Sequence, residues 1–136
     1  MLKNKLIITF ILVSVIITMN CKREIHLYDG DELIEIHEIT GYHKYISYTG
    51  LNITRIQGLD KITELEELDL SWNKLTTLKG LGLEKLTNLK ILKIHDNKIS
   101  KIEGLDNLIN LKELLLYNNR IRKIEGLENL VNLEKL

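Results

Sequence analysis

The chain has 136 residues with 19 basic and 19 acidic side chains, so it can form one compact domain or one short repeat array, and its balanced charge argues against a binder of nucleic acid or another polyanion. It contains 27 leucines and 20 isoleucines but no alanine and no proline, which argues against a disordered chain, a collagen or a coiled coil. The single cysteine, Cys21, excludes an internal disulfide framework and a thiolate zinc cluster.

The first 21 residues have the outline of a secretory signal peptide. Lys3 and Lys5 precede an uncharged run over residues 6–19, which is shorter than the roughly 20 apolar residues of a membrane-spanning helix. The run ends at Cys21 and resembles a bacterial lipoprotein signal, although residues 17–20 lack the usual leucine and small residue of that motif. The resemblance implies cleavage of residues 1–20, acylation of Cys21, and an exported chain anchored to a membrane in the envelope or on the surface of a bacterium. An ordinary cleaved signal and an uncleaved anchor remain the alternatives.

Residues 21–39 are interpreted as a lipid-anchored linker followed by an N-terminal cap. Residues 24–39 alternate in polarity around Asp29-Gly30, which predicts a short hairpin that covers the open edge of the segment after it. His26 and His37 lie in this segment close to acidic residues, but nothing in the pattern makes them converge. We therefore predict no metal site.

Residues 40–136 contain a repeat with a period of 22. Residues 86–107 are followed at once by residues 108–129, which match them at each recurring apolar position of the repeat, and residues 62–85 carry the same pattern with two extra residues. Residues 40–61 match more loosely, with Leu51 where the other repeats have asparagine, and residues 130–136 open one further unit. These repeats, LxxLxxLxLxxNxIxxIxGLxx, resemble the leucine-rich repeats of internalins and of a eukaryotic phosphatase regulatory subunit.

The resemblance implies an α/β fold: a leucine-rich repeat solenoid, wound as a right-handed superhelix, with a parallel sheet on its concave side and short 3₁₀ or helical turns on its convex side. The residues support such a coil independently. Leu68-Asp69-Leu70 alternates inward and outward as a strand does, while Ile99, Ile102 and Leu105 recur every three residues and suit a tight return turn. Because one repeat cannot bury its own apolar face, neighbouring repeats must cover each other.

One asparagine follows each of the three regular strands. Asn73, Asn97 and Asn119 occupy the corner where the backbone turns and leaves amide groups without strand partners. We interpret these residues as a structural ladder. Gly58, Gly104 and Gly126 also recur, which indicates a positive φ or a close backbone approach and not a phosphate-binding loop.

The outward residues of the predicted strands form columns across the concave wall, and several are large and apolar. Such side chains favour a protein-binding surface, although scattered exposed hydrophobic residues are also ordinary. The candidate ligand contacts are Tyr45, Trp72, Ile91, His95, Leu115 and Tyr117. We predict no catalytic residues and no cofactor, because no nucleophile–base order or paired inward carboxylates stand in the sequence.

The C-terminal end of the repeats has no polar cap after Leu130, Leu133 and Leu136. Leu111, Leu114, Leu116, Ile121 and Ile124 would then lack a covering neighbour. Either the chain is a fragment of a longer repeat protein, or this edge associates with a second copy.

Three functional hypotheses follow. The first is an exported, lipid-anchored, non-enzymatic module that binds a protein ligand through its concave wall. The second is a truncated or degenerate remnant of a longer repeat protein without an independent function. The third, intracellular phosphatase regulation, follows from the resemblance alone and is opposed by the export signal.

Overall fold

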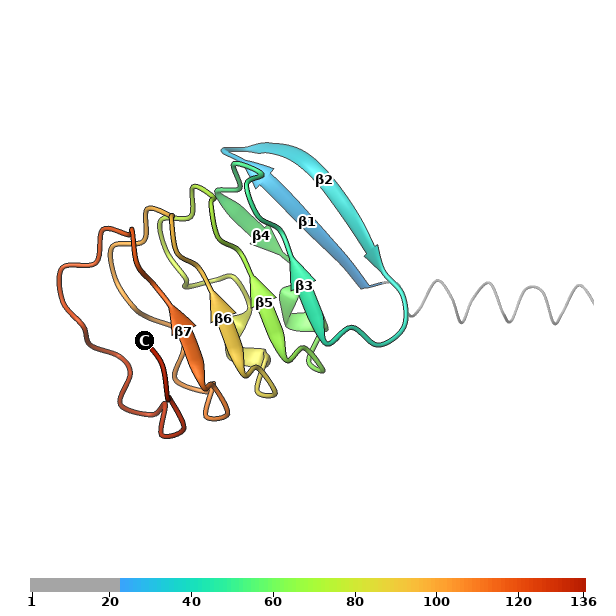
Figure 1. Ribbon diagram of the computed structural model, residues 1–136. Helices are drawn as coiled ribbons and strands as arrows, with labels where there is room; N and C mark the ends of the chain where they lie inside the picture. Colours follow the sequence, from blue (N-terminus) through green and yellow to red (C-terminus); the bar gives the residue numbers. More distant parts are fainter. Residues whose placement is uncertain (1–22) are drawn as a thin grey trace, which may run out of the picture.

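The computed structural model describes residues 23–136, so the predicted signal peptide and Cys21 lie outside the described residues. The chain forms two sheets (Figure 1), and their strands interleave in sequence because β3 of the second sheet precedes β4 of the first. The first is antiparallel, with strand order β2-β1-β4, and the second is parallel, with order β3-β5-β6-β7. The strands are β1 (Arg23–Asp29), β2 (Glu32–Ile39), β3 (Tyr45–Ser47), β4 (Arg55–Gln57), β5 (Glu67–Asp69), β6 (Ile91–Lys93) and β7 (Glu113–Leu115).

The parallel sheet contains one strand from each of four successive repeats. Ile46 of β3 pairs with Leu68 of β5, Leu68 with Leu92 of β6, and Leu92 with Leu114 of β7. All four side chains are buried, and the residues on either side of each are at least partly exposed. The alternation within each triplet thus decides which side of the sheet packs inward. The pairing also aligns the outward residues in the columns that the period of 22 predicts.

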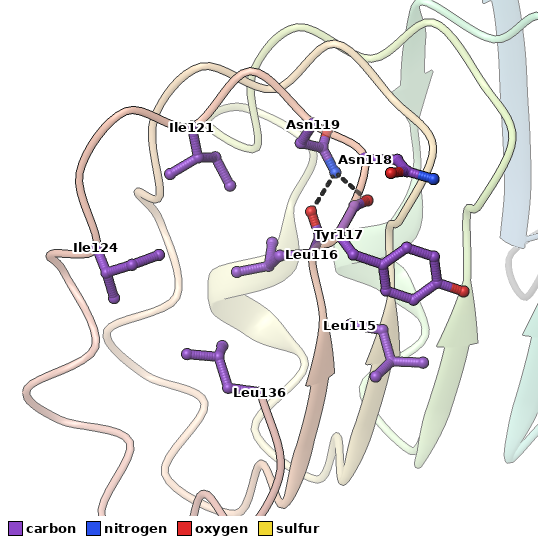
Figure 2. Close-up of a pocket in the computed structure, with 8 residues that line it drawn as sticks. All are labelled: Leu115, Leu116, Tyr117, Asn118, Asn119, Ile121, Ile124 and Leu136. Carbon is purple, nitrogen blue, oxygen red and sulfur yellow. Dashed lines mark hydrogen bonds between the residues drawn. The ribbon is translucent and has the colours of Figure 1, made fainter.

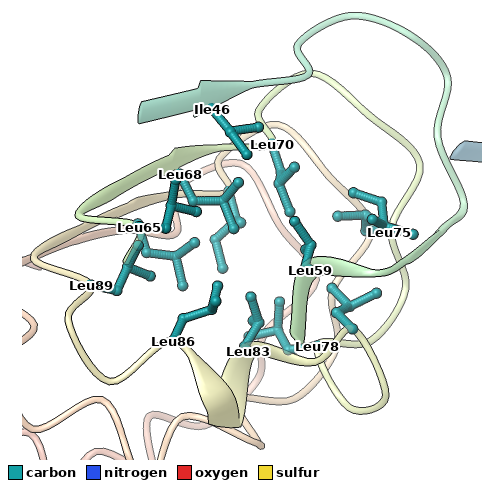
Figure 3. Packing of buried hydrophobic residues seen from close by; sticks show 14 of the residues in the cluster. Ile46, Leu59, Leu65, Leu68, Leu70, Leu75, Leu78, Leu83, Leu86 and Leu89 are labelled. Atoms are coloured by element: carbon teal, nitrogen blue, oxygen red, sulfur yellow. The ribbon is translucent and has the colours of Figure 1, made fainter. Parts of the chain in front are cut away.

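The core is a continuous stack of leucine and isoleucine that runs through all the repeats. Figure 3 shows Leu68 and Leu70 of one strand segment meeting Leu59, Leu83 and other side chains from the return segments. These side chains are fully or almost fully buried, and each contributes about 1.5–3 kcal/mol to folding by its transfer from water. The bulk of leucine and isoleucine fills the space between the two walls of the coil.

The return segments differ between repeats. Two carry short 3₁₀ helices, η1 (Leu59–Lys61) and η2 (Leu83–Lys85), each preceded by a glycine with a positive φ. The return segment of the first repeat does not form only a tight turn as predicted, because residues 55–57 form β4. This strand pairs with β1, so the cap determines the conformation of the repeat on which it packs.

The N-terminal hairpin β1–β2 lies at the end of the array (Figure 1). Ile25 and Leu27 of β1 are fully buried in the common core, and β1 also pairs antiparallel with β4. The Arg23 guanidinium forms an ion pair with Glu64, which belongs to the second repeat. The hairpin is therefore part of the packed structure and shields the first repeat from solvent.

Candidate functional site

The outward side of the parallel sheet, with the corner residues that follow each strand, is called the sheet face below. It contains four columns that run across the strands. In strand order they are Tyr45, Glu67, Ile91, Glu113; then Ser47, Asp69, Lys93, Leu115; then Thr49, Ser71, His95, Tyr117; and then Gly50, Trp72, Asp96, Asn118. Because adjacent strands lie about 4.8 Å apart, neighbours within a column are close enough for side-chain contact.

Three aromatic side chains form one continuous group on this face. The rings of His95 and Tyr117 are stacked with centroids 4.3 Å apart, and the Trp72 ring meets His95 edge-on at 6.3 Å. We call these three residues the aromatic row. Trp72 and Tyr117 are 62% and 55% exposed although each ring contacts its neighbour, so they present large apolar area to solvent on a sheet held by backbone hydrogen bonds. Tryptophan and tyrosine are among the residue types that most often dominate the binding energy of protein interfaces.

Asp96 fixes the central ring of the aromatic row. One carboxylate oxygen of Asp96 lies 2.8 Å from His95 Nδ1, and the other accepts a hydrogen bond of 2.9 Å from Asn118 Nδ2. The hydrogen bond from His95, followed by the one from Asn118, lowers the pKa of Asp96 below its ordinary value. The carboxylate therefore stays ionised at neutral pH and holds the imidazole in one orientation.

The Asp96–His95 pair is not part of a catalytic triad in this structure. Ser71 precedes His95 in the third column, but its hydroxyl makes no hydrogen bond among residues 23–136. Ser71 is also 1% exposed, which closes its oxygen to a substrate. Within the same described range, no group of three or more His, Cys, Asp and Glu side chains lies in position to hold a metal ion.

The charged residues of the sheet face pair across two columns, and the neighbours Asp69 and Lys93 of the second column do not pair with each other. Lys93 Nζ lies 2.6 Å from Glu67 Oε1, and the hydrogen bond to Glu67 raises the pKa of Lys93, with a smaller contribution from Asp69. The Asp69 carboxylate instead accepts a hydrogen bond of 3.0 Å from the backbone N–H of Ser71. The side chain of Glu67, which is longer than that of Asp69, reaches Lys93 diagonally from the neighbouring column. The order of residues within a column does not predict such a diagonal pair.

The structure brings together only part of the candidate contact set. Trp72, His95 and Tyr117 form the aromatic row. Ile91 and Leu115 are half-buried on β6 and β7, in the first and second columns. Tyr45 is 53% exposed on β3, in the first column and at the opposite end of the sheet from Tyr117. Asp96 and Asn118 were absent from the candidate set, although each directly precedes a ladder asparagine in the sequence, as Trp72 does, and therefore belongs to the same column as Trp72.

Trp72 has a backbone conformation that is unusual for a large side chain. Its φ is 60°, in the left-handed region. The equivalent positions in the other repeats are Gly50, Asp96 and Asn118, residue types that accept this region readily. A tryptophan there costs about 1–3 kcal/mol of backbone strain, and strain of this kind concentrates at functional sites.

The three corner asparagines make one repeated pattern of hydrogen bonds beneath the sheet face. Asn97 Oδ1 accepts from the Leu75 N–H at 3.0 Å, while its Nδ2 lies 3.0, 3.1 and 3.2 Å from the carbonyl oxygens of Leu70, Ile94 and His95. Equivalent bonds surround Asn73 and Asn119. Each side chain thus joins its own corner to the preceding repeat, which keeps the backbone under the aromatic row in place.

A second asparagine series was missed at the sequence level. Asn88, Asn110 and Asn132 each donate a side-chain hydrogen bond, 2.8–2.9 Å long, to a backbone carbonyl of the preceding repeat. The recurrence of these residues at a spacing of 22 was the available signal.

A hollow of about 380 Å³ adjoins the aromatic row at the C-terminal repeat (Figure 2). Leu115 and Tyr117 line it from the sheet face, and Ile121, Ile124 and Leu136 line it from the return segment and the last strand segment. The expectation that Leu111, Leu114 and Leu116 would lack cover is wrong, because all three are buried. Residues 130–136 cover them, and the Lys135 carbonyl accepts a hydrogen bond from the Leu114 N–H. Ile124 does remain exposed.

Comparison with known proteins identifies the repeats. A profile of leucine-rich repeats, in two copies, matches residues 63–107. Two solved structures from Listeria monocytogenes strain 4b F2365 are similar: the internalin InlF, with 33% identity over 62% of this chain and a TM-score of 0.55, and internalin C2, with 33% identity over 66% of this chain and a TM-score of 0.53. This chain spans 26% and 37% of their lengths. No curated protein sequence matches.

These similarities confirm the prediction of internalin-like leucine-rich repeats. Such domains are typically protein-binding and non-catalytic. Among residues 23–136 no helix has the length and apolar character needed to cross a bilayer.

Proposed function

We propose that this chain is an exported, lipid-anchored leucine-rich repeat protein that binds a protein ligand through its sheet face, on the concave side of the coil, without catalysis. Export and anchoring rest on the lysines, the apolar run and Cys21 within the first 21 residues. Binding through the sheet face rests on the aromatic row and on its neighbours Ile91 and Leu115. The two parts are independent and need separate experiments.

The observation that carries the binding proposal is the exposed Trp72 in a left-handed backbone conformation. Asparagine, aspartate or glycine, which the other repeats have at this position, would adopt the left-handed conformation with less strain. A large, exposed and strained side chain lowers stability, and contact with a partner is a benefit that offsets this loss. Ser71, buried beside it without a hydrogen-bond partner among the described residues, adds a second unfavourable feature at the same place.

Protein is a better partner for this surface than nucleic acid. The columns of the sheet face carry the carboxylates of Glu67, Asp69, Asp96 and Glu113 but only two lysines, Lys93 and Lys135, of which Lys135 continues the first column beyond β7. A phosphate backbone would meet net repulsion there, whereas aromatic and aliphatic side chains suit the apolar centre of a protein interface.

The binding test uses the full-length chain as bait in extracts of the producing cells and of cells that they contact. Trp72→Asn and Tyr117→Ala should lose the captured partner, and we expect Trp72→Asn to keep or raise stability because asparagine fits the backbone. Ile109→Ala, a 51% exposed residue outside the columns, is the matched control and should retain binding. Equal capture by all variants would rule out the sheet face, and no specific capture by the wild-type chain would favour a remnant without its own function.

The anchoring test compares the wild-type chain with Cys21→Ser in its producing cells. Metabolic labelling with a palmitate analogue should mark the wild-type chain alone, and the variant should leave the membrane fraction. Equal labelling and equal fractionation of the two chains would contradict lipid anchoring while leaving the binding proposal intact.

A further inference from the structure

The charges of the sheet face are not balanced internally. Of its four carboxylates, Glu67 is paired with Lys93, and Glu113 lies 3.0 Å from Lys135, which continues the first column. Both cations are thereby neutralised. Asp69 and Asp96 form no ion pair with a lysine or arginine among residues 23–136, so the face retains a net negative charge that its own side chains do not neutralise.

One of these two carboxylates, Asp96, lies next to Trp72, the most exposed ring of the aromatic row. Trp72 and Asp96 are successive members of the fourth column: the Trp72 N–H bonds to the His95 carbonyl, and the Asp96 N–H bonds to the Tyr117 carbonyl, each at 3.1 Å. Their backbones are therefore one strand spacing apart. His95 and Asn118 hold the Asp96 carboxylate with one hydrogen bond to each oxygen, which leaves further lone pairs on both oxygens unused.

An aromatic ring next to an ionised carboxylate is a suitable binding site for a cation. The ring attracts positive charge over its face, and the carboxylate supplies hydrogen-bond acceptors and a formal charge. The N-terminal end of the chain already shows the first of these contacts, because the Arg55 guanidinium lies 4.1 Å from the centroid of the Tyr28 ring. Arginine suits such a site better than lysine, since its planar group stacks on a ring while its N–H donors reach a carboxylate.

We propose that the protein ligand presents an arginine side chain whose guanidinium lies on Trp72 and donates hydrogen bonds to Asp96. The inference rests on the proposed function of the sheet face and adds the chemistry of the partner to it. A partner with an acidic side chain at this place would meet Asp96 and find both lysines of the face already paired. Apolar residues on either side of the arginine would contact Tyr117 and the half-buried Leu115.

The experiment exploits the fact that Trp72 is the only tryptophan in the chain, so its fluorescence reports on this place alone. The full-length protein in detergent micelles is titrated with three capped peptides, Gly-Ile-Xaa-Ile-Gly, in which Xaa is arginine, its neutral isostere citrulline, or glutamate. We expect the arginine peptide to bind about three- to tenfold more tightly than the citrulline peptide at low salt, and the glutamate peptide to bind least well. The preference should shrink in 0.5 M salt.

Two variants test whether the preference for arginine over citrulline depends on Asp96. Asp96→Asn should bring the affinities for arginine and citrulline together, and it should fold because Asn118 has the same backbone conformation one repeat later. Glu113→Gln removes a carboxylate that is already paired on the same face and should leave the preference unchanged. A circular dichroism spectrum and an unfolding curve for each variant show that the fold is retained.

The outcome can be separated from that of the proposed function. Equal binding of the arginine and citrulline peptides, or a preference that survives Asp96→Asn, would overturn this inference even if a captured partner depends on Trp72. A preference for arginine that requires Asp96 would support the inference even if the extracts yield no partner. In that case the extracts would lack the ligand, and the site at Trp72 and Asp96 would stand.

Discussion

At the scale of single residues, the corner asparagines show how one side chain can replace several missing backbone partners. Asn97 is buried, and it accepts one backbone hydrogen bond while its amide group lies near three carbonyl oxygens from two repeats. Leu51 occupies this position in the first repeat, and there Asn73 of the next repeat accepts from the N–H groups of both Leu51 and Ile53. The asparagine of the second repeat therefore supplies a side-chain partner at the corner where the first repeat has none of its own.

This arrangement predicts the effect of Asn97→Ala. The substitution leaves the Leu75 N–H and the carbonyl groups around it without a side-chain partner in a buried place, so we expect a loss of about 1–3 kcal/mol in the free energy of unfolding. Urea unfolding followed by Trp72 fluorescence measures the loss. Asn110→Ala, which removes one exposed hydrogen bond to Thr87, is the control and should change stability by less than about 1 kcal/mol. Equal effects would show that burial does not distinguish the two series.

The asparagines also show what the sequence could and could not predict at this scale. The repeat pattern, with the two extra residues of residues 62–85, placed Asn73, Asn97 and Asn119 at equivalent corners, and the strand register then placed Trp72, His95 and Tyr117 side by side. The period does not predict side-chain reach, which is why the ion pair of Lys93 with Glu67 was missed. The strain at Trp72 was also missed, because a positive φ at this corner is visible only from the backbone.

At the scale of elements, the junction between the cap and the first repeat depends on backbone contact. β1 pairs with β4 through residues 26–28 and 55–57, and Gly58 follows β4 directly. Gly58 has a φ of 95°, and a Cβ at this position would overlap the Glu24 carbonyl oxygen. A repeat pattern could not reveal this pairing, because β1 lies outside the repeats and contacts β4 across a long stretch of sequence.

Gly58→Ala is therefore expected to be strongly destabilising. The alanine combines an unfavourable positive φ with a backbone clash that only a shift of β1 can relieve, so the free energy of unfolding should fall by more than about 2 kcal/mol. Gly80→Ala is the matched control: its φ is +81°, but a Cβ there would meet no atom within 4 Å, so only the conformational cost of about 1–2 kcal/mol applies. Thermal unfolding by circular dichroism compares the two, and a larger loss for Gly80→Ala would contradict the clash.

At the scale of the whole molecule, stability comes from contacts between neighbouring repeats, and the charged residues follow the same rule. Glu66 accepts Lys44 Nζ of the preceding repeat at 2.7 Å on one oxygen and Lys90 Nζ of the following repeat at 2.6 Å on the other. One carboxylate thus connects three repeats at the N-terminal ends of the strands of the parallel sheet. The hydrogen bond from Lys44, followed by that from Lys90, lowers the pKa of Glu66 to about 2.

The lowered pKa predicts how stability responds to acid. Below the ordinary glutamate pKa of 4.5 the unfolded chain takes up a proton at Glu66, whereas the folded chain keeps the carboxylate ionised down to about pH 2. The contribution of Glu66 to folding is therefore complete at neutral pH and is lost as the pH falls from about 4.5 to about 2. Glu66→Gln should be less stable than the wild-type chain at pH 7 and should lose less further stability in acid.

The measurement is the urea midpoint at low salt at a series of pH values between 7 and 3. The curves of the wild-type chain and Glu66→Gln should converge toward the acid end, and 0.5 M salt should reduce the gap at pH 7 because the three side chains remain accessible to ions. Glu84→Gln, which alters an exposed carboxylate without an ion pair among residues 23–136, should follow the wild-type curve. A constant gap across the pH range would show that Glu66 acts by packing and not by its charge.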